Sequence, residues 1–324
     1  MELEKFLSII EEDLEAIEDT IKLNLKNDIK LITTIGSHIL DSGGKRLRPA
    51  LLLLTSKLLN NLHKDRLAIA TAIEFIHTAT LLHDDVVDNS ELRRGQSSAN
   101  SIWGNEASVL VGDFLFAKAF TLMVNCNNPD ILTIMSNATK ELAEGEIYEL
   151  IKTGDLQTAK EEYFKIIEKK TAVLFAAACE VSAVLANTNK EQRNSLRQFG
   201  LNIGKSFQLV DDALDYVSTD EKFGKKIGID IEEGKVTYPF IFSLEKATEA
   251  EYEKIKELFY KETPSKEDIL FIKNFVIDKG GTEATIQEAK KFSEKATEKL
   301  EIFPDNEAKN ILIKLSKFIV NRRF

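Results

Sequence analysis

The chain has 324 residues, of which 43% are hydrophobic, and it carries a formal net charge of −10. This length and apolar content suffice for a large buried core. The acidic balance argues against a nucleic-acid partner, because the average field of the protein would repel the phosphates.

The first segment, MELEKFLSIIEEDLEAIEDT, is acidic. It lacks the basic start, the apolar core and the small-residue cleavage site of a secretory signal. No apolar run is expected to reach the roughly eighteen residues that a membrane-spanning helix needs. The two cysteines, Cys126 and Cys179, are far apart and are interpreted as packing residues. These features predict a soluble cytoplasmic protein whose cysteines stay reduced.

Helix is the expected structure along the whole chain. Only 15 glycines and 5 prolines occur, and no stretch shows the strict alternation of a half-buried strand. Turn-forming residues are expected to divide the helices at Ser42–Gly44, Asn127–Pro129, Thr153–Asp155, Asn187–Asn189, Gly224–Gly234, Pro264, Gly280–Gly281 and Pro304. None of these breaks is long enough for an interdomain linker. The sequence therefore predicts an all-α fold without strands.

Basic residues gather in three short stretches of this acidic protein. They are GGKRLRP at 43–49, LRRG at 92–95 and FGKKIGIDIEEGK at 223–235. The first lacks both the GxxxxGK[ST] spacing and the preceding strand of a P-loop. Three basic islands predict a small anionic ligand, whereas Arg46 and Lys226 are interpreted as solvated side chains.

One acidic motif occurs twice with identical spacing, as DDVVD from Asp84 and as DDALD from Asp211. Residues four apart on a helix lie one above the other, so Asp84 sits over Asp88 and Asp211 over Asp215. Like charges at this spacing destabilise a helix, and both motifs lie in apolar sequence. A cation is expected to offset the repulsion. Oxygen ligands without cysteine or a histidine pair favour Mg²⁺.

Taken singly, each of these features has an ordinary structural explanation that requires no function. An acidic pair on a helix is usually a solvated face, and a lone histidine such as His77 is more often a satisfied core residue. Two copies of the acidic motif in apolar sequence, each near basic residues, favour a site for metal and phosphate instead.

The ordered set of motifs resembles the all-trans polyprenyl diphosphate synthase family, in its long-chain form. The motifs are GGKRLRP, EFIHTATLLHDDVVDNSELRRG, VLVGDFLFAKAF, KKTA, SFQLVDDALDY and FGKKIGIDIEEGKVTYP, spanning roughly residues 40–240. The resemblance implies one domain over residues 1–324. It implies a single bundle of antiparallel helices around a deep central cavity, the isoprenoid synthase fold, with the two aspartate motifs facing each other across its mouth. It also implies a homodimer.

The same resemblance implies the reaction. An allylic diphosphate ionises, isopentenyl diphosphate attacks the cation, and a proton is lost to leave a trans double bond. Expelling pyrophosphate is the hard step, and metal ions and cationic side chains stabilise the charge that develops. No ordinary general base is evident, and the resemblance implies that the departing pyrophosphate takes the proton. Membrane contact is expected to be at most transient, for product release.

Individual roles also follow from the resemblance. Two Mg²⁺ ions are shared by Asp84 and Asp88 and a third is held by Asp211, with Asp85, Asp212 and Asp215 in supporting positions. The allylic diphosphate is gripped by Arg93, Lys170, Lys225 and Lys235, and the homoallylic diphosphate by Lys45, Arg48, His77 and Arg94. Arginine suits this task because its fork meets phosphate oxygens in pairs. The groups facing the carbocation are Lys170, Thr171 and Gln208. The glycine-punctuated loop at 224–234 is similar to a lid that closes on the phosphates.

Product length depends, in the resembled family, on the residue five positions before the first aspartate. A bulky residue there stops the chain early, and this sequence has Ala79. At 100° per residue, Ala72 and Ala68 share a stripe with Ala79 that extends about 16 Å. An open wall of this length predicts a product of about seven to nine isoprene units, C35 to C45. Phe75 is expected to close the channel in part, and Phe120 or Met123 on a facing helix to form its floor, unless the stripe serves only close helix packing.

Other functions remain open at this point. A short-chain farnesyl or geranylgeranyl diphosphate synthase would share both motifs but would need a bulkier residue to close the channel. A non-catalytic subunit of a heteromeric synthase generally loses aspartates from one motif, and this chain keeps both. A terpene cyclase has no use for a second diphosphate site, against which Lys45, Arg48 and Arg94 weigh. A metal-stabilised helical scaffold leaves the three basic islands unexplained.

Overall fold

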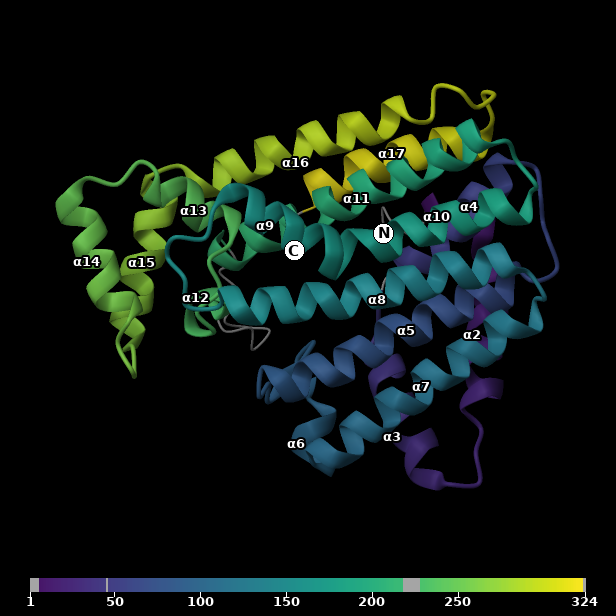
Figure 1. The fold of residues 1–324 in the computed structure, drawn as a ribbon, viewed down its shortest axis with the longest axis horizontal. Coiled ribbons are helices and arrows are strands. Elements are labelled where there is room, and N and C mark those ends of the chain that lie inside the picture. The colour runs from purple at the N-terminus through teal and green to yellow at the C-terminus, as the bar shows by residue number, and fades with distance from the viewer. Residues whose placement is uncertain (1–5, 45, 218–227, 323–324) are drawn as a thin grey trace. The chain divides into compact units, whose positions relative to one another are not determined.

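The computed structural model describes residues 6–44, 46–217 and 228–322. Helices dominate these ranges, as Figure 1 shows, and the all-α expectation is confirmed. The elements of the first part are η1 (Ser8–Ile10), α2 (Glu11–Leu25), α3 (Lys30–Asp41), α4 (Leu47–Leu58), α5 (Arg66–Val87), β1 (Leu92–Arg93), β2 (Gln96–Ser97), α6 (Ala99–Trp103), α7 (Asn105–Asn125) and α8 (Pro129–Lys152). Those of the second part are α9 (Lys160–Ile167), η2 (Glu168–Ala172), α10 (Val173–Leu185), α11 (Lys190–Val217), α12 (Ile229–Glu232), α13 (Tyr238–Leu244), α14 (Glu249–Phe259), α15 (Lys266–Asp278), α16 (Gly281–Glu298) and α17 (Glu307–Asn321).

Helices end at several of the expected breaks, and the structure adds others, such as those between α2 and α3 and between α4 and α5. Helix α8 begins at Pro129, the last residue of one expected break, and α16 begins at Gly281. Gly280 has φ +75°, a left-handed conformation that glycine adopts without strain. Of the expected break at 224–234, residues 224–227 lie outside the described residues.

The chain divides into two compact units. Unit 1 comprises Met1–Thr139, Leu174–Gly200 and Leu300–Leu315, and unit 2 comprises Lys140–Val173, Leu201–Lys299 and Ser316–Phe324. The first aspartate motif belongs to unit 1 and the second to unit 2. The single domain expected over residues 1–324 stays a prediction.

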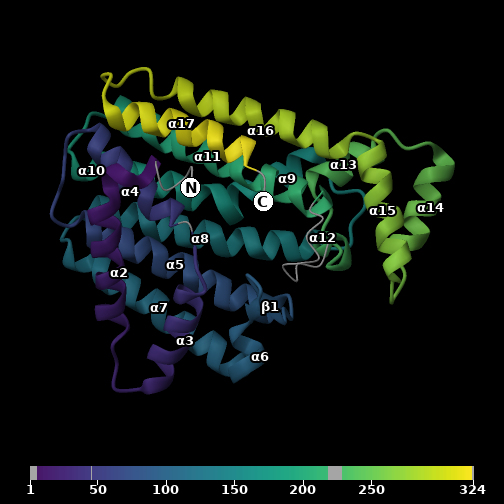
Figure 2. The ribbon, with the colours of Figure 1, turned by 180° about the vertical axis from the view of Figure 1, so that it is seen from behind.

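Unit 1 is built around helices α4, α5 and α7, which Figure 2 shows from behind. Four consecutive leucines of α4, residues 51–54, are each at most 1% exposed, so this helix is buried on every side. Helix α5 packs most extensively on α7. A Cβ on Gly112 of α7 would lie 2.3 Å from the ring of His83, so the absence of a side chain lets the two helices approach.

Unit 2 has its own apolar core. It gathers side chains from α11, α13, α15 and α16, including the fully buried Tyr216, Phe240, Ile272 and Val276. A Cβ at Gly281, the first residue of α16, would lie 2.3 Å from the carbonyl oxygen of Pro239. Glycine is therefore required where α16 begins against α13. The second aspartate motif sits on α11 against this core.

The expectation that no apolar run reaches spanning length was wrong for α7. This helix of 21 residues is long and apolar enough, by length and composition alone, to cross a membrane, although 33% of its most apolar window is buried within the protein. Its exposed side includes Val109, Leu110 and Val124, which are 36%, 66% and 54% exposed. Core helices of globular proteins pass the same test, so length and composition alone do not establish a membrane span.

Candidate functional site

The first aspartate motif closes helix α5. Asp84 and Asp85 lie in its last turn, and Asp88 follows as the capping residue, its backbone N–H donating to the carbonyl of Asp84 over 2.8 Å. The predicted stacking of Asp84 and Asp88 on successive turns is therefore confirmed. Both are partly exposed, whereas Asp85 is fully buried. The motif thus presents two carboxylates to solvent and one to the protein.

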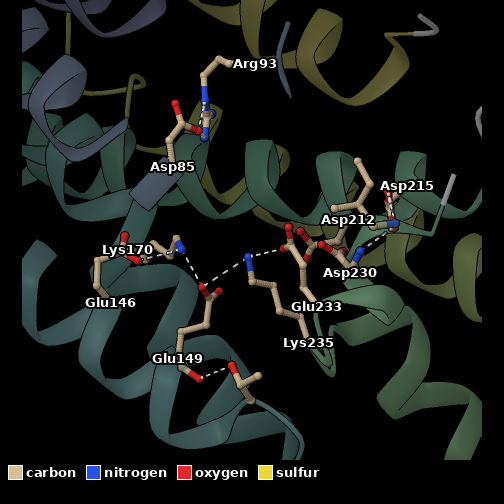
Figure 3. Close-up of polar contacts among 12 residues, drawn as sticks. Asp85, Arg93, Glu146, Glu149, Lys170, Asp212, Asp215, Asp230, Glu233 and Lys235 are labelled. Carbon is tan, nitrogen blue, oxygen red and sulfur yellow. Dashed lines mark hydrogen bonds and ion pairs between the residues drawn. The ribbon is translucent and has the colours of Figure 1, made fainter. Parts of the chain in front are cut away.

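A short hairpin that the sequence analysis did not expect holds Asp85. Strands β1 and β2 pair Leu92 with Ser97, and the two turn residues Arg94 and Gly95 have φ of 53° and 78°. Two successive left-handed residues suit the twist of a tight hairpin. The Arg93 side chain in β1 donates from Nε to Oδ1 of Asp85 over 2.7 Å (Figure 3). Arg93, predicted to grip a diphosphate, is here paired with a carboxylate.

Burial changes the pKa of Asp85 and leaves one of its oxygens without a partner in the described part of the chain. Removal from water raises the pKa of its carboxyl group, although the hydrogen bond and charge of Arg93 act in the opposite direction. The second oxygen, Oδ2, is buried and has no hydrogen-bond partner among the described residues. An unsatisfied buried carboxylate oxygen costs free energy, so this position favours a cation or a donor.

Basic side chains surround His77, which lies in the middle of α5. Its pKa lies well below the usual value, first because it is removed from water and then because Arg48, Arg94, Arg93 and Arg46 repel a positive charge. His77 is therefore neutral at pH 7. The predicted grouping of His77 with Arg48 and Arg94 is seen in unit 1. Lys45, predicted beside them, lies outside the described residues.

Arg46 is not the solvated side chain that the sequence analysis expected. Its guanidinium donates to Glu18 over 2.7 Å, to Glu74 over 2.6 Å and to the carbonyl of Leu40 over 3.0 Å, and its side chain is 12% exposed. Its φ is +45°, at the cap of α4. The isolated sequence gives no sign of these acidic partners, which lie 28 residues away on either side. Arg46 thus fastens the loop before α4.

The second aspartate motif is held by different groups. Asp211 forms an ion pair with Arg322 near the end of the chain, and the same guanidinium donates to the carbonyl of Phe207 over 2.9 Å. The carboxylate of Asp215 accepts from the backbone N–H groups of Ile229 and Asp230, over 3.3 and 3.2 Å. Asp215 therefore caps the first turn of α12.

Asp212 is the most enclosed member of the second motif. Its carboxylate accepts from the hydroxyl of Tyr163 over 2.5 Å and from Nε2 of Gln208 over 2.8 Å. Burial raises its pKa to about 7, even though both hydrogen bonds favour the ionised form. Thr171, in the π-helical turn η2, donates to the amide oxygen of Gln208 over 2.7 Å. The predicted neighbours Thr171 and Gln208 are therefore in direct contact.

Two predicted phosphate-binding lysines share an acidic partner. Figure 3 shows Lys170 and Lys235 pointing toward Glu149, with Nζ to Oε2 distances of 2.5 and 3.9 Å. Lys170 also contacts Glu146 at 2.8 Å, and Lys235 contacts Glu233 at 2.7 Å. Glu149 lies where both lysines can neutralise an anion. Lys225, predicted with them, lies outside the described residues, as does the lid segment around it.

Close helix packing brings these groups together. A Cβ at Gly145 of α8 would lie 2.6 Å from the backbone nitrogen of Lys170, so α8 can touch η2 only because position 145 has no side chain. This contact aligns the acidic side of α8 with the lysine. Single π-helical turns such as η2 are frequently found at functional sites.

A cavity of about 120 Å³ lies among these residues of unit 2. Its lining includes Lys170, Thr171, Gln208, Asp212, Asp230 and Lys235. Asp230 was not singled out by the sequence analysis. Its pKa is raised well above the usual value, first by burial and then by the charges of Asp215 and Asp212. The cavity therefore joins cationic, polar and acidic groups in one place.

Several side chains of the site were missed from sequence. They are Tyr163, Glu146, Glu149, Asp230 and Glu233. Glu146 and Glu149 occur in EGEIYEL beside Gly145, a sequence like that of many solvated helical faces, and only the contact of Gly145 with η2 distinguishes them.

The predicted chain-length residues occupy one buried stretch. Ala72, Phe75 and Ala79 on α5 are all 0% exposed, and Phe120 on α7 is partly buried. The close approach of α5 and α7 at Gly112 agrees with tight packing between these helices. Their role as a channel wall stays a prediction.

The donor chemistry of both motifs fits Mg²⁺, because every candidate ligand is a carboxylate oxygen. Among the described residues, no three acidic, histidine or cysteine side chains converge into a closed site. A cation bound at such a motif would complete its coordination with water and substrate oxygens, as Mg²⁺ usually does.

Comparisons with known proteins agree with these observations. Residues 29–276 match the family described as Polyprenyl synthetase. The chain is 37% identical to the octaprenyl diphosphate synthase of Escherichia coli, over 99% of each protein. Among solved structures, a polyprenyl synthase from Caulobacter crescentus complexed with calcium and isoprenyl diphosphate has a TM-score of 0.95 and 39% identity, covering 99% of this chain and 98% of that one. A decaprenyl diphosphate synthase from Rhodobacter capsulatus has a TM-score of 0.93 and 36% identity, covering 98% of both.

Proposed function

This chain belongs to the polyprenyl synthetase family, and we propose that it joins isopentenyl diphosphate to an allylic diphosphate until the product has about seven to nine isoprene units. It is a prenyltransferase of the long-chain trans type. The observation that carries the detailed proposal is the pair of DDxxD motifs at α5 and α11, each with an arginine on one of its aspartates.

The metal sites are the first part of this proposal. Asp84 and Asp88 would share two Mg²⁺ ions and Asp211 would hold a third, supported by Asp85, Asp212 and Asp215. Support comes from the all-oxygen donor set and from the buried, unpartnered Oδ2 of Asp85. When bound, Mg²⁺ stabilises the negative charge that develops on departing pyrophosphate.

Lys170 and Lys235 would grip the allylic diphosphate together with Arg93 and Lys225. Their present partner Glu149 supports this role, because it shows that both ammonium groups reach one anion. A diphosphate carries more charge than a carboxylate and would compete for both lysines. The homoallylic diphosphate would bind Lys45, Arg48, His77 and Arg94. The arginines around His77 support this assignment, because a cluster of positive charges attracts an anion.

The chemical step breaks one carbon–oxygen bond and forms one carbon–carbon bond. The allylic carbon–oxygen bond breaks with both electrons leaving on pyrophosphate, and the double bond of isopentenyl diphosphate attacks the cation. A carbon–hydrogen bond then breaks, its electrons form the new double bond, and pyrophosphate takes the proton. The oxygens of Thr171 and Gln208 line the cavity beside Lys170 and would stabilise the cation.

A homodimer is also proposed, with the apolar side of α7 as its contact. Val109, Leu110 and Val124 recur along one face of this helix and remain exposed. Such a face is unfavourable in water and suits a second copy of the chain. Sedimentation velocity should show twice the chain mass, and Leu110→Asp should shift it toward the monomer. A monomeric wild-type protein would contradict this part.

Location is proposed as cytoplasmic, with at most transient membrane contact during product release. The unpaired state of Cys126 and Cys179 supports a reducing compartment.

The reaction itself is tested by metal-dependent turnover. Purified protein is incubated with farnesyl diphosphate and labelled isopentenyl diphosphate, with Mg²⁺ or with excess EDTA. We expect label in a hydrophobic product only with Mg²⁺, accompanied by released pyrophosphate. Turnover that persists in EDTA would contradict the metal assignment, and no turnover in Mg²⁺ would favour a non-catalytic subunit.

A further inference from the structure

Tyr163 connects two parts of unit 2 that the proposed reaction uses. Its hydroxyl, on α9, donates to Oδ2 of Asp212 on α11 over 2.5 Å. Gln208 donates to Oδ1 of the same carboxylate over 2.8 Å and accepts from Thr171 in η2 over 2.7 Å. A continuous chain of hydrogen bonds therefore runs from the π-helical turn, through Gln208 and Asp212, to Tyr163.

Asp212 depends on these two donors. It is 5% exposed, so water cannot solvate its carboxylate, and a buried carboxylate without donors is strongly unfavourable. Each oxygen receives one donor from a side chain. A carboxylate held at both oxygens has a fixed orientation, which makes Asp212 a joint between α9 and α11 rather than an open ligand.

Tyr163 is itself held in place by packing. Its side chain is almost fully buried, and its ring contacts the rings of Phe164 and Tyr238, with centroids 5.4 and 5.8 Å away. Phenylalanine would keep these contacts and remove only the hydroxyl. Nothing in the residues around Tyr163 distinguishes it from other tyrosines, because its partner lies 49 residues further along the chain.

We propose that Tyr163 is a positioning residue of the prenyl transfer reaction: acting through Asp212, it fixes the second aspartate motif relative to the turn that carries Lys170 and Thr171. This inference rests on the proposed function. Asp211 and Asp215 flank Asp212 on α11, and Lys170 belongs to the turn at the other end of the hydrogen-bonded chain. Without a fixed orientation of Asp212, the distance between the metal-binding aspartates and Lys170 would vary. The proposed function assigns both the aspartates and Lys170 to the allylic diphosphate.

The test is Tyr163→Phe, with Tyr148→Phe as a matched control. The hydroxyl of Tyr148 also donates to a carboxylate, that of Glu162 over 3.3 Å, but this pair is only partly buried and lies outside the chain of hydrogen bonds. Steady-state kinetics would give KM for each substrate, and calorimetry would give the Kd of an uncleavable allylic thiolodiphosphate in Mg²⁺. We expect Tyr163→Phe to weaken allylic binding and to raise the Mg²⁺ requirement about tenfold, as for loss of a hydrogen bond to a charged group. KM for isopentenyl diphosphate and all constants of Tyr148→Phe should stay within about twofold of wild type.

A double variant separates positioning from general damage. If Tyr163 acts through Asp212, adding Tyr163→Phe to Asp212→Asn should cause no further loss of allylic binding. This comparison also serves if Tyr163→Phe alone proves too unstable to purify, because an amide at 212 leaves no buried charge unpaired. Equal losses for both substrates, additive losses in the double variant, or wild-type behaviour of Tyr163→Phe would each overturn the inference. An inactive wild-type protein would instead overturn the proposed function.

Discussion

The two aspartate motifs share one spacing but are held in different ways. In the first, buried Asp85 is paired with Arg93, eight residues further along the chain. In the second, Asp212 is held by Tyr163 and Asp211 by Arg322, which are 49 and 111 residues away. A repeated pattern can therefore specify the same carboxylates while leaving their supporting groups to the local packing.

The largest effect is expected from removing a metal-binding charge. Asp84→Asn and Asp211→Asn should each lower kcat by about 100- to 1,000-fold, because less charge stabilises the leaving pyrophosphate. Steady-state release of pyrophosphate measures this loss. Asp305→Asn, whose side chain is 93% exposed, is the control and should behave as wild type. If only one of the two motifs proves sensitive, their proposed equivalence as metal sites is wrong.

Removing the arginine partners should show how the two motifs differ. Arg93→Ala leaves the fully buried Asp85 without its partner and should lower the free energy of unfolding by about 3 kcal/mol. Arg322→Ala leaves Asp211 without its partner, but Asp211 is 36% exposed and can be hydrated. The electrostatic loss in the free energy of unfolding should therefore stay below about 1 kcal/mol. Urea unfolding followed by circular dichroism compares them. Equal losses would show that burial does not separate the two motifs.

These cases also show how far the sequence could lead. The helical segments, most of their breaks and the stacking of Asp84 on Asp88 follow from local periodicity and turn chemistry. Arg93 was recognised as part of the site, although its pairing with Asp85 depends on the hairpin turn at Arg94 and Gly95, which helical periodicity does not reveal.

Long-range partners could not be predicted. Tyr163 reaches Asp212 only because α9 packs beside α11, and nothing within either segment distinguishes this tyrosine from an ordinary core residue. Arg46 was misjudged for the same reason, since Glu18 and Glu74 belong to other helices. The glutamates that face Lys170 depend on the absent side chain at Gly145.

The arginines around His77 in unit 1 predict a pH effect on stability. Unfolded His77 takes a proton below pH about 6.5, whereas the folded chain keeps it neutral because burial and the arginines lower its pKa. The unfolded state therefore binds more protons below that pH, and the free energy of unfolding should fall as pH decreases, by up to about 1.4 kcal/mol per pH unit. His77→Gln should remove this contribution. Identical pH slopes in urea titrations of both proteins would contradict the assignment.

A substitution at Ala79 on α5 is expected to have the smallest effect on the reaction rate but to change the product. Ala79→Tyr should shorten the product without a large loss of turnover, because the side chain would enter the proposed channel. Ala70 is equally buried and lies about 180° around the same helix, so Ala70→Tyr should overpack the core and lower stability by about 1–3 kcal/mol without shortening the product. Mass spectrometry of the products separates the two. Unchanged product length in Ala79→Tyr would refute the channel assignment.

The most direct test of the account is the product of the purified chain alone. Incubation with Mg²⁺, farnesyl diphosphate and labelled isopentenyl diphosphate, followed by dephosphorylation and mass spectrometry, gives the chain length. A product of about C35 to C45 is expected from the length of the alanine stripe on α5. A product that stops at C15 or C20, or no elongation without a second protein, would contradict a self-sufficient long-chain synthase.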